Sequence, residues 1–216
     1  MIEELLRLRF PSDYGLDIEK VNVPLSTQSE SFTLSDQKAC SECKADRPER
    51  EKCDEKTLKI KLATDETVTI VNFEKYLNQF GNRLEKYGTK RCDFLILDDN
   101  ESHRKVAFCD LTCSDHRYVD GQTGKRAKVV KQMKDSLESL LKVDVLNQYI
   151  LTFQDKVFLF GWREFLISDT EPERNNPLSN MGTFCQTPSA MSGTLEYQPY
   201  KGFVFIQVKY PAEYQW

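Results

Sequence analysis

Apolar and polar positions follow two different periods along the chain, and together they predict both strands and helices. Residues 58–62 and 67–71 alternate with period two, and Thr64-Asp65-Glu66 between them favours a turn. This pattern predicts a β-hairpin. Large apolar residues then recur at spacings of three and four from Phe73 to Tyr87, which predicts a helix that ends before Gly88.

The remaining pattern adds elements on both sides of this region. The further predicted elements are a short amphipathic helix over 1–10, strands over 93–98, 105–113, 156–160 and 203–210, and a long helix from 125 to beyond 141. Residues 11–56 look irregular, and residues 168–193 are rich in Pro, Asn, Ser, Thr and Gly, which favours a long loop. We therefore expect an N-terminal part (1–56) and an α/β core (57–216), an α+β fold with a central mixed β-sheet flanked by helices.

Composition limits the classes of function. The 216 residues include 13 Phe and 9 Tyr, enough for a folded core, and no apolar run is long enough to span a membrane. The first ten residues lack the pattern of a secretory signal, so we expect a cytoplasmic protein. The net charge is −4, which argues against binding nucleic acid through overall charge and requires a local basic patch instead.

Seven cysteines, an odd number without a signal peptide, indicate a reducing compartment rather than a disulfide framework. The spacing of Cys40, Cys43 and Cys53 permits a structural Zn²⁺ site, since zinc prefers four soft ligands in a tetrahedron. The fourth ligand of such a site would be Asp54, Cys113 or His116. The alternative is an exposed, reduced loop.

Two aspartates in the middle of the chain suggest a second type of metal site. If Asp98 pairs with Lys105 in a hairpin, the register places Asp93 opposite Asp110, with Cβ atoms about 4.5 to 5.5 Å apart. Two carboxylates this close repel each other unless a cation lies between them. Together with the carbonyl of Leu111, they would suit a hard divalent ion, Mg²⁺ or Mn²⁺.

The order helix, Asp-led strand, Asp-x-Thr strand, Lys-rich helix and buried strand, over residues 72–161, resembles the PD-(D/E)xK nuclease superfamily. The resemblance implies a restriction-endonuclease-like core in which Asp93 and Asp110 bind the metal. An additional acid from the preceding helix would be Glu85, with Glu74 as the other choice. Thr112 stands where the family has its motif Lys, so Lys128 or Lys131 would have to replace it, or the site is inactive.

A cluster of basic residues opens the second long helix. Its members are Lys125, Arg126, Lys128, Lys131 and Lys134. Helix N-terminal amides together with such side chains form a good phosphate cradle, which predicts binding of nucleic acid. The alternative is a solvated basic face that serves solubility.

These observations lead to two hypotheses about function. The first is a metal-dependent nuclease that hydrolyses DNA or RNA, and the resemblance extends it to defence against foreign nucleic acid. The second is a catalytically inactive, nuclease-like subunit that binds a protein partner or a second copy of itself. In the second case Asp93 would cap a strand and Asp110 would pair with Lys128.

Overall fold

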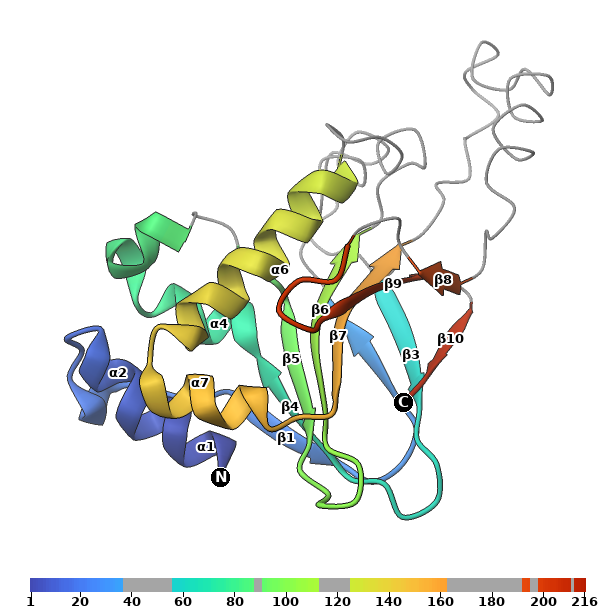
Figure 1. The fold of residues 1–216 in the computed structure, drawn as a ribbon, viewed down its shortest axis with the longest axis horizontal. Coiled ribbons are helices and arrows are strands. Elements are labelled where there is room, and N and C mark those ends of the chain that lie inside the picture. The colour runs from blue at the N-terminus through green and yellow to red at the C-terminus, as the bar shows by residue number, and fades with distance from the viewer. Residues whose placement is uncertain (37–55, 88–90, 113–124, 163–191, 195–197, 211) are drawn as a thin grey trace, which may run out of the picture.

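The structure is a computed structural model that describes residues 1–36, 56–87, 91–112, 125–162, 192–194, 198–210 and 212–216 (Figure 1). It is an α+β fold built from a mixed sheet, a second, smaller sheet and a layer of helices, which confirms the predicted fold class. No helix in these ranges is both long and apolar enough to cross a membrane.

The large sheet has seven strands in the order β1-β4-β5-β6-β7-β9-β8. Their bounds are β1 (Leu25–Gln28), β4 (Val68–Asn72), β5 (Phe94–Asp98), β6 (Lys105–Thr112), β7 (Asp155–Trp162), β9 (Val204–Lys209) and β8 (Ser192–Thr194). The β6–β7 and β7–β9 pairs are parallel, and the other pairs are antiparallel, so the sheet is mixed as predicted.

The small sheet has the order β10-β3-β2, with bounds β10 (Glu213–Gln215), β3 (Thr57–Lys61) and β2 (Phe32–Ser35). Strand β3 pairs antiparallel with β2 and parallel with β10. The predicted hairpin between residues 58–62 and 67–71 is therefore wrong, because β3 and β4 belong to different sheets. Alternation correctly identified both strands, but it carries no information about which strand pairs with which.

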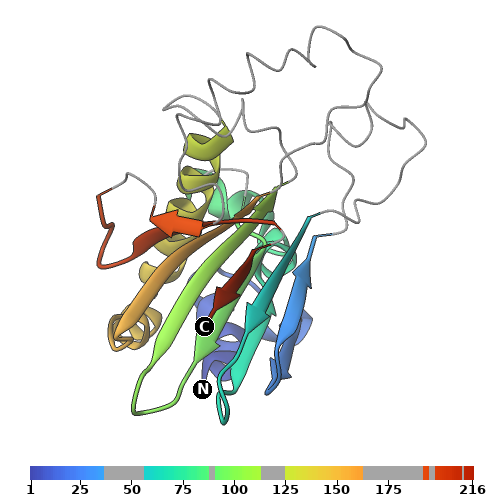
Figure 2. The ribbon, with the colours of Figure 1, turned by 90° about the vertical axis from the view of Figure 1, so that its right-hand side faces the viewer.

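Helices cover one face of the large sheet, and the small sheet covers the other face (Figures 1 and 2). The helical layer contains α1 (Ile2–Glu4), η1 (Leu5–Arg9), α2 (Phe10–Asp13), α4 (Phe73–Asn78), η3 (Gly81–Tyr87), α6 (Lys125–Leu141) and α7 (Asp144–Leu151), and the short turn η2 (Ile18–Lys20) follows α2. Two apolar cores result, one on each face. The predicted helices thus cover one face of the central sheet, and the small sheet covers the other.

The N-terminal residues are integrated into both sheets. Strand β1 pairs with β4, and β2 pairs with β3, so the prediction of an irregular segment over 11–56 is wrong for these two strands. Both are only four residues long, too short for a clear period-two signal. The predicted N-terminal helix is confirmed, and its Leu6 and Phe10 are fully buried.

The predicted helix over 73–87 divides into α4 and the 3₁₀ segment η3. Asn72 caps α4 by accepting a hydrogen bond from the Lys75 N–H at 3.0 Å. The break coincides with Gly81, whose φ of +50° is a left-handed conformation that interrupts a helix. The apolar spacing continues across the break, which explains why the sequence predicted a single helix.

The C-terminal half follows the predicted pattern in most respects. Helix α6 and strands β7 and β9 lie where the sequence placed them. The expected loop over 168–193 falls mainly outside the described residues, and Ser192 and Gly193 at its end belong to β8.

Gly161 lies at a close contact between the two layers of sheet. A Cβ added there would lie 2.6 Å from Leu111 Cδ2 and 3.4 Å from Leu58 Cβ. Leu111 is on β6 and Leu58 is on β3 of the small sheet, so Gly161 lets the small sheet pack onto the large one.

We expect Gly161→Ala to lower the free energy of unfolding by about 1 to 3 kcal/mol, because the added methyl group crowds a packed core. Chemical denaturation measures this loss. Leu111→Ala and the double variant complete a thermodynamic cycle in which the combined loss should be smaller than the sum of the single losses. Additive losses would contradict crowding between these two side chains.

Candidate functional site

The central hairpin brings Asp93 and Asp110 to the same end of two paired strands. In the register of β5 and β6, Asp98 pairs with Lys105, as predicted, and Phe94 pairs with Cys109. Asp93 directly precedes Phe94 and Asp110 directly follows Cys109, so the two acids are neighbours across the hairpin. Asp110 is buried, and Asp93 is partly buried.

Asp93 is held by hydrogen bonds from two directions. Its Oδ2 accepts a hydrogen bond from the Leu111 N–H at 2.7 Å, just beyond the paired part of the hairpin. Its backbone carbonyl accepts the N–H groups of Phe73 at 2.8 Å and Glu74 at 3.3 Å, which fixes the start of α4 against the strand. The metal-binding role predicted for the Leu111 carbonyl stays a prediction.

The environment of Asp93 favours its neutral form. Burial is the largest cause and, together with the charges of Asp36 and Glu74, raises the pKa of Asp93 to about 7, while the Leu111 N–H and the Lys56 ammonium oppose the shift. A carboxyl group with this pKa is only partly ionised at neutral pH. A bound cation would favour the ionised form.

Asp110 faces helix α6 and receives a hydrogen bond from it. Gln132 Nε2 lies 3.3 Å from Asp110 Oδ2 and 3.2 Å from the carbonyl oxygen of Arg91. Burial is the main reason that the pKa values of the Cys92 and Cys109 thiols are raised, and the charges of both aspartates add to each shift. Both acids therefore lie close to the same two buried thiols.

Lys56 brings a positive charge to this site, and the sequence pattern did not identify it. It is only 8% exposed, forms an ion pair with Asp36, and lies close enough to lower the pKa of Asp93. Asp36 directly follows β2 and Lys56 directly precedes β3, so pairing of these strands brings them together. Both flank the charged segment in which acids and bases alternate without an apolar face, and no local signal distinguishes a buried lysine there.

The acid from the preceding helix that influences Asp93 is Glu74, at the start of α4. Glu85, the residue predicted for this role, is exposed on η3. The role predicted for Glu85 stays a prediction, and Glu74 is the acid that the described contacts associate with Asp93.

The basic cluster is only partly available for a ligand. Lys131 forms an ion pair with Asp135, and the Lys134 ammonium lies 4.7 Å from the ring centroid of Tyr200 and 5.5 Å from that of Phe205. Lys128 is exposed. Gln132 is a residue of α6 that reaches Asp110.

Several predicted residues lie outside what the structure describes. These are the cysteines of the predicted zinc site, Cys40, Cys43 and Cys53, the further ligand choices Asp54, Cys113 and His116, and the side chains of Lys125 and Arg126.

The described site therefore contains buried carboxylates, a buried ammonium and an amide donor at one end of the sheets. Oxygen ligands from two carboxylates suit Mg²⁺ or Mn²⁺, and Lys56 offsets part of the negative charge near Asp93. Thr112 is buried and, like every threonine, cannot supply a positive charge.

Comparison of the chain with protein-family models, with curated proteins and with solved structures finds no match in any of the three. The resemblance to the PD-(D/E)xK superfamily therefore remains a prediction from the sequence pattern.

The raised pKa of Asp93 makes a specific prediction about stability. An acid whose pKa is higher in the folded than in the unfolded protein stabilises the fold most below its unfolded pKa of 3.8, and this contribution is lost as the pH rises through about 7. Asn does not titrate, so we expect Asp93→Asn to remove this pH dependence of the free energy of unfolding, which is on the order of a few kcal/mol. Asn also retains an oxygen that can accept the Leu111 N–H. The measurement is chemical denaturation of both proteins between pH 4 and 8.

All other titrating groups are common to the two proteins, so the difference between the curves isolates Asp93. If the difference in free energy of unfolding between wild type and Asp93→Asn is the same at every pH from 4 to 8, the raised pKa of Asp93 is contradicted.

Proposed function

We propose that this protein is a divalent-metal-dependent nuclease that hydrolyses phosphodiester bonds in DNA or RNA. The observation that carries the proposal is the placement of Asp93 and Asp110, two carboxylates on paired strands in a buried environment. Keeping two buried carboxylates ionised at one end of a hairpin is costly, and a divalent ion bound between them would reduce this cost.

Each residue of the site has a role in this proposal. Asp93 and Asp110 would hold Mg²⁺ or Mn²⁺, which supplies charge stabilisation to a phosphate and lowers the pKa of a bound water. The Leu111 N–H holds Asp93 in place, and Gln132 orients Asp110. Lys56 takes the place of the motif lysine, because it is the buried cation whose charge influences Asp93.

The nucleic acid would be held locally. The first turns of α6 carry Lys125, Arg126 and the exposed Lys128, a short basic stretch in a chain of net charge −4. A cytoplasmic location and a role in defence against foreign nucleic acid are further parts of this proposal, and they rest on the sequence alone.

A second candidate is an inactive, nuclease-like module that binds another protein or a second copy of the chain. The hydrogen bond from Leu111 to Asp93 favours it, because Asp93 then acts as the cap of a strand end. The internal contacts of Lys131 and Lys134 favour it as well, since neither ammonium is directed only to solvent.

The cleavage test uses plasmid DNA and single-stranded RNA with Mn²⁺. We expect the wild-type chain to cleave at least one of them, and Asp110→Asn to lower the rate at least about 100-fold through loss of a metal ligand. Asp155→Asn, at the exposed opposite end of β7, is the matched control and should retain the wild-type rate. Equal rates for wild type and Asp110→Asn would rule out this site, and no cleavage by the wild type would favour the second candidate.

The role of Lys56 has its own test. Lys56→Met should lower the cleavage rate at least about tenfold, because the charge that offsets the buried acids is lost. Lys59→Met, three residues further along in β3, removes an exposed lysine that pairs with Glu213 and is the control. If both variants cleave at the same rate, Lys56 has no special role in the reaction.

A further inference from the structure

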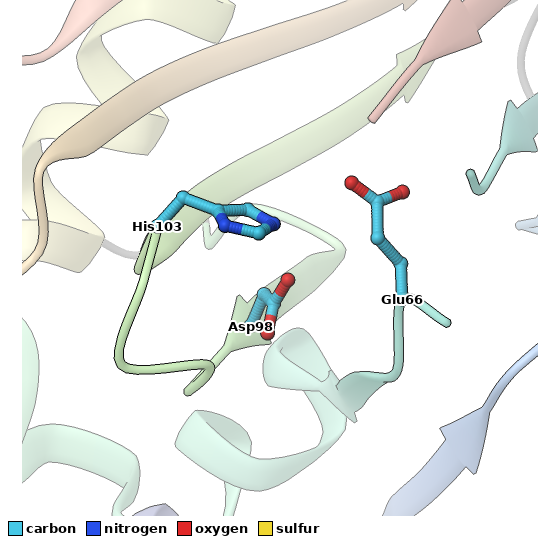
Figure 3. Close-up of side chains that lie close together, drawn as sticks. All are labelled: Glu66, Asp98 and His103. Atoms are coloured by element: carbon cyan, nitrogen blue, oxygen red, sulfur yellow. The ribbon is translucent and has the colours of Figure 1, made fainter. Parts of the chain in front are cut away.

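Three potential metal ligands meet at the opposite end of strand β5 from Asp93. Glu66 comes from the turn between β3 and β4, Asp98 is the last residue of β5, and His103 belongs to the turn between β5 and β6. Each offers one donor atom, and these atoms all lie within 4.8 Å of one another. Figure 3 shows the imidazole of His103 and the carboxyl group of Glu66 directed toward the space above Asp98.

Asp98 provides the observation that points to a ligand. The residue is 2% exposed, and its Oδ1 accepts the Asn100 N–H at 2.9 Å. Its Oδ2 is buried and has no hydrogen-bond partner among the described residues. A buried carboxylate oxygen without a partner is costly, and a cation placed against it would remove this cost.

The hydrogen bonds around His103 leave one ring nitrogen available. Ser102 Oγ donates to Asn100 Oδ1 at 2.9 Å, and the same oxygen accepts the Ser102 N–H at 3.1 Å. With the single hydroxyl proton of Ser102 directed to Asn100, Oγ accepts from Nδ1 of His103 at 2.7 Å in the tautomer that carries its hydrogen on Nδ1. The neutral ring then carries its lone pair on Nε2, and a hydrogen bond at the other nitrogen is the usual arrangement of a metal-binding histidine.

Glu66 is positioned by its own turn. Its Oε2 accepts the Ala63 N–H at 2.6 Å, which holds the carboxyl group over the turn and leaves Oε1 to face a ligand. Asp65, the preceding residue, has a φ of +71°, a left-handed conformation that directs the chain around this turn.

One lysine lies near the cluster and limits its negative charge. The Lys105 ammonium is 4.9 Å from the ring centroid of Tyr214 and 4.7 Å from that of Trp216. Burial lowers the pKa of Lys105, and the charges of Asp155, Glu66 and Asp98 oppose this shift. Three carboxylates thus lie around one ammonium, and this negative balance favours a dication.

We propose that Glu66, Asp98 and His103 bind one divalent transition-metal ion, with Zn²⁺ as the representative of the class. One imidazole nitrogen and two carboxylate oxygens are a ligand set that zinc accepts, at bond lengths of about 2.0 to 2.2 Å. Two donors on one ion therefore lie at most about 4.4 Å apart, so the partly exposed Glu66 and the exposed His103 close slightly around the ion.

The bound ion would act as a structural clamp. Glu66 lies where the chain leaves the small sheet and enters the large one, and the ion joins this turn to the β5–β6 turn. The site is separated from Asp93 by five residues of β5, roughly 17 Å at about 3.3 Å per residue, so it stands independently of the proposed nuclease site.

The test follows the ring ¹⁵N signals of the full chain by NMR during titration with Zn²⁺. The chain has two histidines, and His103→Gln identifies which ring signals belong to His103, since His116 is itself a candidate zinc ligand. We expect the His103 signals to shift as zinc is added and to stop shifting once this site holds one ion. The zinc affinity measured from these signals should fall at least about tenfold in Asp98→Asn. Zinc held by cysteines elsewhere does not produce this shift of the His103 ring.

Two further variants distinguish the loss of a zinc ligand from a general loss of folding. Glu66→Gln keeps an oxygen for the Ala63 N–H and should also weaken the shift at least about tenfold. Asp65→Asn removes the neighbouring exposed charge at a position where Asn tolerates the left-handed backbone, and it should bind zinc as the wild type does. His103 signals that do not move with zinc, or that move with equal affinity in Asp98→Asn and Glu66→Gln, would overturn the proposal.

Discussion

Burial of the β5–β6 hairpin on both faces is the constraint on which the rest of the structure depends. All five residues of β5 are buried, and β6 is buried from Val106 onward. The helices pack on one face and the small sheet packs on the other, so these strands have no solvated side. Polar groups at the ends of this hairpin therefore lose hydration and destabilise the fold unless a partner compensates them.

Both ends of the hairpin carry aspartates in this situation. At one end lie Asp93, near the charge of Lys56, and Asp110, which receives a hydrogen bond from Gln132. At the other end Asp98 has a buried oxygen that finds no hydrogen-bond partner in the described part of the chain, and His103 lies beside it. The same physical cause, a carboxylate desolvated by two layers of packing, supports the proposed reaction site and the proposed metal clamp.

The sequence anticipated a substantial part of the site as well as of the fold. The pairing of Asp98 with Lys105 followed from two apolar runs joined by a polar stretch, and the observed register has this pair and ends with Phe94 opposite Cys109, next to Asp93 and Asp110. Lys56 and Gln132 were not found, because Lys56 is brought to Asp93 only by the small sheet. Gln132 lies among the lysines of α6, where no local pattern distinguishes it from solvent-facing polar residues.

Local periodicity by itself determined which segments form strands and helices, since alternation and helical spacing depend on neighbouring residues only. It determined neither the partners of the strands nor the sheet in which each one lies. The separation of β3 from β4 was decided by the tertiary structure, in which β3 finds β2 and β10 and covers the second face of the hairpin. The environments of Asp93 and Asp98 were decided in the same way, because burial and long-range charge exist only after distant segments have packed together.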